Sequence, residues 1–180
     1  PIQEKTEEEV YNMVLPKGSK QEKAFIRLVV TFVTLVKSSC KSVKEVLQQA
    51  INADDERSVF IIKNIFQPVY ERYINALSDS NQIDFTDAIL QATEICRTSH
   101  PVEYDYIIVD ELQAISVDRY NLLTVLREGN PPATLYCVGD DWQSIYRFSG
   151  SDMALFNQFP EYFGATEINK IETTYRFGEP

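Results

Sequence analysis

Two short apolar runs, each followed directly by acidic residues, constrain the fold of this chain most. Residues 104–109 lead into Asp110 and Glu111, and residues 134–138 lead into a Gly-Asp-Asp sequence that starts at Gly139. Runs of this length, rich in β-branched and aromatic residues, are typical of strands, and the amphipathic stretch between them is typical of a helix. Strand–helix–strand order predicts a parallel sheet in an α/β fold, with both acidic segments at the edge where such sheets bind ligands.

Most of the chain before residue 100 has helical periodicity. Apolar residues on nearly every side of 22–37 predict a helix buried among others, and 42–52 has the pattern of a short amphipathic helix. A longer pattern starts at the Asp54-Asp55 pair, where an aspartate suits the N-cap. Pro68 interrupts this pattern. Because proline lacks a backbone donor and clashes with the preceding turn, we expect a kink or a break near Phe66.

The chain divides into three parts by the character of its sequence. Residues 1–21 are rich in glutamate and predict a solvated, poorly ordered lead-in. Residues 22–80 predict a mainly helical subdomain. Residues 81–180 predict the α/β unit, which opens with a helix from residue 83 to about residue 97 and adds a third strand at 166–172.

The two carboxylates after the first strand form the candidate centre of a site. Asp110 and Glu111 are adjacent, so along a continuing strand their side chains would point to opposite faces of the sheet. A turn at the end of the strand would let both face one pocket, where two carboxylates suit a magnesium ion and an attacking water. A solvated strand end without chemistry is the alternative for this pair taken alone. Gln113 completes Asp-Glu-x-Gln, and this longer pattern favours the functional interpretation.

The segments around both acidic clusters resemble a known family of molecular motors. Residues 106–113 (Tyr-Ile-Ile-Val-Asp-Glu-Leu-Gln) and 138–150 (Val-Gly-Asp-Asp-Trp-Gln-Ser-Ile-Tyr-Arg-Phe-Ser-Gly) resemble motifs II and III of the UvrD/Rep-like superfamily 1 DNA helicases. Residues 173–177 resemble the start of motif IV, and residues 83–90 resemble an Asp-Phe-x-Asp-Leu segment upstream of motif II. Trp142, with the Tyr-Arg-Phe-Ser-Gly run, is most similar to the helicase IV branch of this family.

This resemblance implies a fold and an activity. The fold would be part of a RecA-like P-loop NTPase motor lobe with parallel strands, preceded by the helical subdomain. The activity would be that of an ATP-dependent 3′–5′ DNA helicase and translocase, which uses ATP and Mg²⁺ on single-stranded and partly duplex DNA. Since the sequence shows no signal peptide and no apolar run of membrane length, we expect the protein in the cytoplasm. Gly-Asp-Asp also forms a metal site in some RNA-dependent polymerases, but the Trp-Gln-Ser-Ile-Tyr continuation matches the helicase pattern.

The resemblance also assigns roles to individual residues. Catalytic roles fall to Glu111, Gln143 and Arg176. The magnesium ion would be held by Asp110, directly or through water, together with Glu111. Nucleotide contacts are implied for six residues: Asp110, Gln113, Asp140, Gln143, Tyr175 and Arg176. Tyr146 and Phe148 would stack on DNA bases, which aromatic rings do without sequence preference. Packing in the core is the alternative for these two rings.

Two positions depart from the family pattern. Ala114 stands where a carboxylate commonly follows the glutamine of motif II, and Ser149 stands where an arginine often links the nucleotide to DNA. These departures leave a second function open. The parent protein would then be a helicase-like accessory protein that regulates a partner such as RNA polymerase or a nuclease.

A phosphate-binding loop of the form G-x-x-x-x-G-K-[ST] does not occur in the sequence, because none of the six glycines is followed by lysine. We therefore expect an internal fragment of a longer parent helicase, inactive without the remainder of that protein. The net charge of −10 argues against wrapping of nucleic acid by bulk electrostatics. No apolar run reaches the length of a membrane span, so we expect no membrane partner.

Overall fold

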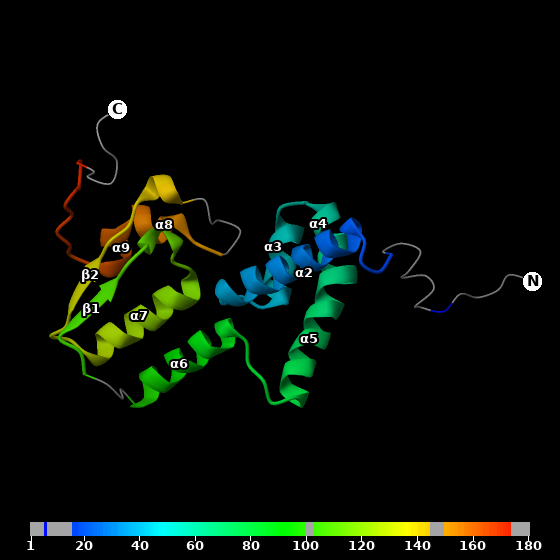
Figure 1. The fold of residues 1–180 in the computed structure, drawn as a ribbon, viewed down its shortest axis with the longest axis horizontal. Helices are drawn as coiled ribbons and strands as arrows, with labels where there is room; N and C mark the ends of the chain where they lie inside the picture. Colours follow the sequence, from blue (N-terminus) through cyan, green and yellow to red (C-terminus); the bar gives the residue numbers. More distant parts are fainter. Residues whose placement is uncertain (1–5, 7–15, 100–102, 145–149, 174–180) are drawn as a thin grey trace, which may run out of the picture.

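The chain folds into two groups of elements (Figure 1). Helix α6 belongs to neither group and packs against α7 of one and α2 of the other. The computed structural model describes residues 6, 16–99, 103–144 and 150–173. One group contains helices α2 to α5, and the other contains a small parallel sheet with α7, α8 and α9. The elements in chain order are α2 (Lys20–Ser38), α3 (Val43–Asn52), α4 (Glu56–Ile61), the π-helical turn η1 (Ile62–Phe66), α5 (Gln67–Asp79), α6 (Phe85–Ser99), β1 (Tyr106–Val109), the 3₁₀ turn η2 (Leu112–Ala114), α7 (Val117–Gly129), β2 (Thr134–Cys137), the 3₁₀ turn η3 (Asp141–Gln143), α8 (Met153–Asn157) and α9 (Phe159–Phe163).

Local capping sets where the helices of the first group begin. The Ser42 side chain accepts a hydrogen bond from the Glu45 backbone N–H, and the Glu45 carboxylate accepts one from the Ser42 N–H, which is a capping box. Asp55 caps α4 by accepting from the Ser58 N–H at 3.0 Å, as predicted. Pro68 lies at the second position of α5, directly after η1, where the helical hydrogen bonds widen to the π pattern. The expected disturbance near Phe66 therefore takes the form of a π-helical turn between α4 and α5, and the helix continues through it.

The core of the first group is a cluster of four buried side chains: Val36, Val43, Ile62 and Phe66. Phe32 stacks on Phe66 with ring centroids 4.2 Å apart. The prediction that α2 is buried on every side was wrong, because Ile26, Leu28 and Val30 are each at least half exposed. One side of α2 packs against this cluster, and an adjacent side, which shares Val29, lines an open groove described below.

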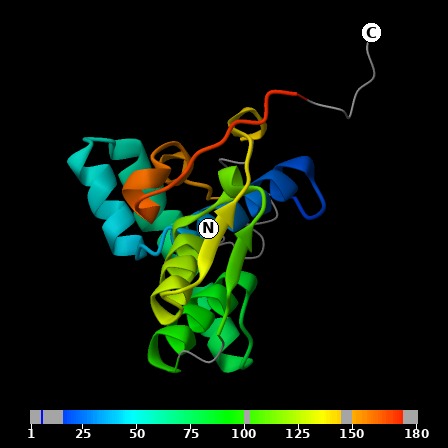
Figure 2. The same cartoon turned by 90° about the vertical axis from the view of Figure 1, so that its left-hand side faces the viewer.

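The second group contains the predicted parallel sheet. Strands β1 and β2 pair in parallel, with Tyr106 opposite Thr134 and Val109 opposite Cys137, and α7 connects them. Figure 2 shows the two strands side by side with α7 behind them. The inner face of the sheet packs on a second cluster of buried residues, which consists of Leu112, Ile115, Leu155 and Phe163. The α/β class, with a mainly helical region before the sheet, is therefore confirmed.

The described sheet has one exposed face and lacks one predicted strand. Only one face is covered among the described residues, since Tyr106 and Ile108 on the other face are 68% and 72% exposed. The predicted third strand at 166–172 was wrong for the described part of the chain. Its alternating pattern is real, but a strand needs a neighbour for its backbone hydrogen bonds, and no described segment pairs with these residues. No helix among the described residues has the length and apolar character needed to cross a bilayer.

A buried lysine joins the first group to α6. Lys37, near the end of α2, has a side chain only 4% exposed, and its Nζ lies 2.6 Å from Asp84 Oδ2 and 2.6 Å from Asp87 Oδ1 at the start of α6. The Tyr73 hydroxyl donates a further hydrogen bond to Asp84 at 2.8 Å. These contacts fix α2 and α5 to the N-terminal end of α6, which in turn packs along α7.

Candidate functional site

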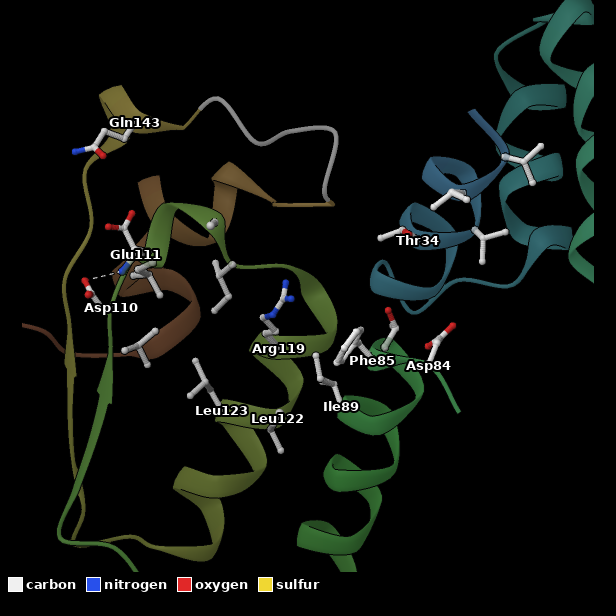
Figure 3. A pocket seen from close by; sticks show the side chains of 18 of the residues that line it. Thr34, Asp84, Phe85, Ile89, Asp110, Glu111, Arg119, Leu122, Leu123 and Gln143 are labelled. Atoms are coloured by element: carbon white, nitrogen blue, oxygen red, sulfur yellow. Dashed lines mark hydrogen bonds between the residues drawn. The ribbon is translucent and has the colours of Figure 1, made fainter. Parts of the chain in front are cut away.

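An open groove of about 1420 Å³ lies between α2, α6, α7 and the carboxyl end of β1 (Figure 3). Its walls are mostly apolar, with contributions from all three helices: Val29, Val30, Val33, Phe85, Ile89, Leu122 and Leu123. One end is polar, because Asp110, Glu111 and Gln143 line it there. Arg119, at the start of α7, carries the only positive charge among the described residues that line the groove.

The backbone turns sharply at the end of β1. Glu111 has φ 54° and ψ 42°, which is the left-handed region. For a residue with a side chain this conformation costs about 1–3 kcal/mol, and it persists only where the surroundings enforce it. The Glu111 N–H donates to Asp110 Oδ1 at 2.8 Å, and the Ala114 N–H donates to the Glu111 carbonyl at 2.9 Å. Asp110 and Glu111 both line the groove, as expected for a turn at the strand end.

Gln113 lies behind these carboxylates and is not one of the residues that line the groove. Its side chain is almost fully buried, at 3% exposure. The amide Nε2 donates to Glu111 Oε2 at 2.5 Å, and Oε1 accepts from the Asp140 N–H at 3.0 Å. Gln113 therefore connects the acidic segment after β1 with the acidic segment after β2.

The segment after β2 places Gln143 at the polar end of the groove. The Leu112 N–H donates to the Val138 carbonyl at 2.9 Å, which holds the two strand ends together. Asp140 then caps the turn η3, since its Oδ1 accepts from the Trp142 N–H at 3.0 Å and its Oδ2 accepts from Gln143 Nε2 at 2.8 Å. Trp142 is 91% exposed at the rim of the groove.

The donor set at the polar end suits one kind of metal site. Among the described residues, no three side chains of the His, Cys, Asp and Glu types come together as a cage for a metal ion. Magnesium is commonly held by one or two carboxylates, with water and substrate phosphates supplying the remaining ligands. Asp110 and Glu111 offer those two carboxylates, so the residues present fit a magnesium ion that arrives with a phosphate ligand.

Several predicted site residues lie outside the described residues: Tyr146, Phe148, Ser149, Tyr175 and Arg176. The structure brings the other predicted residues together at the ends of β1 and β2. Sequence reasoning missed Arg119, which lines the groove and donates to Ser116 Oγ at 2.9 Å. A basic residue in the first turn of the helix that follows the acidic segment was the signal that could have found it.

Comparison with known proteins identifies relatives for most of the chain. The family described as the UvrD/REP helicase N-terminal domain matches residues 2–164. The chain is 43% identical over 114 residues to DNA helicase IV of Escherichia coli (strain K12), covering 63% of this chain and 17% of that protein. It is 33% identical over 125 residues to a probable DNA helicase II homolog of Rickettsia conorii, covering 64% of this chain and 18% of the relative. It is 33% identical over 117 residues to the ATP-dependent DNA helicase Rep of Buchnera aphidicola, covering 62% of this chain and 18% of that protein. The chain thus spans less than a fifth of the length of each of these relatives.

Proposed function

The chain belongs to the UvrD/REP helicase N-terminal domain family, and on that basis we propose that it is part of an ATP-driven 3′–5′ DNA helicase and translocase. The observation that carries this proposal is the shared cavity of Asp110, Glu111 and Gln143 at the ends of two parallel strands. Residues 81–180 form part of the RecA-like motor lobe, and residues 22–80 form a helical subdomain ahead of it. The two separate clusters of buried residues support this division.

Each carboxylate has its own task in ATP hydrolysis. Asp110 uses one oxygen to accept from the Glu111 N–H, which leaves the other free to hold the magnesium ion of MgATP, directly or through water. That ion neutralises charge on the phosphates as the terminal bond breaks. Glu111 accepts a proton from the attacking water, which is the work of a general base. Gln143 senses the terminal phosphate, because an amide can donate to an oxyanion and accept from water.

Residues outside the described part of the chain complete the proposed cycle. Tyr175 and Arg176 contact the adenine ring and the terminal phosphate, and the planar, permanently charged guanidinium suits the second task. Tyr146 and Phe148 stack on the bases of single-stranded DNA.

The phosphate-binding loop belongs to the remainder of the parent helicase, and the 180 residues alone are inactive. Since the chain has a net charge of −10, contacts with single-stranded and partly duplex DNA depend on stacking and on basic surfaces elsewhere in the parent. We place the parent in the cytoplasm.

The test uses Glu111→Gln in the full-length protein, with Glu128→Gln as the matched control. Glu128 is exposed at the end of α7, away from the groove, so the same chemical change there should leave activity unaltered. Glu111→Gln should bind MgATP normally and lower DNA-stimulated turnover by about 10²–10⁴-fold, the usual effect of losing a general base. Turnover equal to that of the control would remove Glu111 from the reaction. If the unmodified protein hydrolyses no ATP, the accessory function becomes the better account.

A further inference from the structure

We infer that Gln113 is a positioning residue that fixes the Glu111 carboxylate and ties it to the Gly139–Asp140 turn. This inference rests on the proposed function, in which Glu111 accepts the proton of the attacking water. Gln113 itself does not line the groove, so it acts through Glu111 and not on the nucleotide. The hydrogen bonds of the buried Gln113 amide thereby set the position of Glu111, after β1, relative to Asp140, after β2.

The first arm of this link ends on the proposed base. Gln113 Nε2 donates to Glu111 Oε2 at 2.5 Å, a charge-assisted bond that leaves the other carboxylate oxygen for the water. Glu111 is also held in the left-handed backbone region, where Cβ crowds the following carbonyl oxygen. A carboxylate on such a turn needs a second restraint to keep one orientation. The Gln113 amide supplies that restraint from a residue that is 3% exposed, while Glu111 itself is exposed to solvent.

The second arm ends on the backbone after β2. Gln113 Oε1 accepts from the Asp140 N–H at 3.0 Å, and Asp140 in turn holds Gln143 Nε2 through Oδ2 at 2.8 Å. A continuous chain of hydrogen bonds therefore runs from Glu111 through Gln113 and Asp140 to Gln143. If the terminal phosphate draws Gln143 away from Asp140, the change is transmitted along this chain to Glu111.

Gly139 provides an independent sign that this contact is built into the fold. A Cβ at Gly139 would lie 2.8 Å from Gln113 Oε1 and 2.6 Å from Phe156 Cε2, so only glycine leaves room for the amide. The orientation of the amide is also determined. With oxygen and nitrogen exchanged, Oε1 would face the Glu111 carboxylate and Nε2 would face the Asp140 N–H, which are both repulsive arrangements.

Gln113→Glu separates the two arms in the full-length protein. The substituted carboxylate has the same shape and can still accept from the Asp140 N–H, but in its ionised form it repels Glu111 instead of donating to it. Gln113→Met removes both arms with little change of volume. Gln91→Glu is the matched control, because Gln91 is exposed on α6 and does not line the groove. The assays are kcat and KM for MgATP, and hydrogen exchange of the peptide that contains the Asp140 amide.

We expect Gln113→Glu to lower kcat by about 10–100-fold, the usual effect of losing a group that orients a reacting residue, with KM nearly unchanged. The Asp140 amide should keep its protection in Gln113→Glu and lose it in Gln113→Met. A Gln113→Glu protein with the kcat of the Gln91→Glu control would overturn the positioning role, provided that Glu111→Gln abolishes turnover. If Glu111→Gln itself stays active, the proposed function fails first, so the two failures can be told apart.

Discussion

Replacing Lys37 with methionine tests the junction between the first group of elements and α6. Methionine keeps most of the aliphatic stem, so the change removes the charge and little of the packing. Lys37 Nζ lies 2.6 Å from each of two carboxylates, and its side chain is 4% exposed. The aspartates, Asp84 and Asp87, would be left facing each other without a counter-ion. Breaking a buried pair in this way costs about 3–5 kcal/mol, and since the two aspartates are 23% and 24% exposed, we expect the lower end, about 3 kcal/mol.

The assay is urea unfolding of the 180-residue chain, followed by circular dichroism. Lys44→Met is the control, because Lys44 is exposed and its loss should change the free energy of unfolding by less than about 0.5 kcal/mol. Adding Asp84→Asn to Lys37→Met should recover part of the lost stability, since it removes one uncompensated charge and keeps a residue able to cap α6. A cost below about 1 kcal/mol for Lys37→Met would show that the pair behaves as an exposed one and would refute the reasoning.

The same pair gives the unfolding free energy a defined pH dependence. Burial raises the pKa of Asp84, but hydrogen bonds from Lys37, the Asp87 N–H and Tyr73 outweigh it, so the pKa is lowered. Burial lowers the pKa of Lys37, but its bonds to Asp84 and Asp87 outweigh that effect, so the pKa is raised. The stabilisation from Asp84 is therefore lost as pH falls below about 4, and that from Lys37 is lost as pH rises above about 10. The difference between wild type and Lys37→Met should be largest between these limits.

Three further outcomes are expected. Gly139→Ala should lower the free energy of unfolding in urea by about 1–3 kcal/mol, because the added methyl group overlaps the Gln113 amide; an unchanged value would contradict the close approach. The 180-residue chain should hydrolyse ATP no faster than its Glu111→Gln variant, and magnesium-dependent turnover that this variant abolishes would show that the chain binds phosphates unaided. In the full-length protein, Tyr146→Ala and Phe148→Ala should weaken single-stranded DNA binding, even at high salt, with little change in melting temperature. A loss of about 3–5 kcal/mol in stability with normal DNA binding would place these rings in the core.

Local signals in the sequence predicted most of the elements. The apolar runs before Asp110 and Gly139 predicted both strands and their parallel pairing. Pro68 predicted the disturbance in the long helical pattern, because the missing backbone donor acts within one turn wherever the helix lies. The turn that directs Asp110 and Glu111 into one cavity was also expected from the end of the strand.

Features that depend on distant parts of the chain were not predicted. The contact between Lys37 and Asp84 joins residues 47 positions apart, and a lysine in an apolar helix gives no sign of its partner. The hydrogen bond between Gln113 and the Asp140 N–H could not be predicted for the same reason, because the two residues are 27 positions apart. The alternating pattern at 166–172 predicted a strand that did not form, because hydrophobic alternation does not specify the neighbour that a strand requires.

The magnesium dependence of ATP turnover in the full-length protein tests most directly whether Asp110 binds the metal ion and Glu111 acts as the general base. Asp110→Asn should raise the magnesium concentration needed for half-maximal turnover by about tenfold or more, since losing 1.4 kcal/mol of metal contact already has that effect. Glu111→Gln should raise this concentration less than Asp110→Asn does, and it should lower the maximal rate by about 10²–10⁴-fold. If Asp110→Asn left the magnesium dependence unaltered, or if Glu111→Gln kept the maximal rate, the assignment of metal ligand and general base to these two residues would be contradicted.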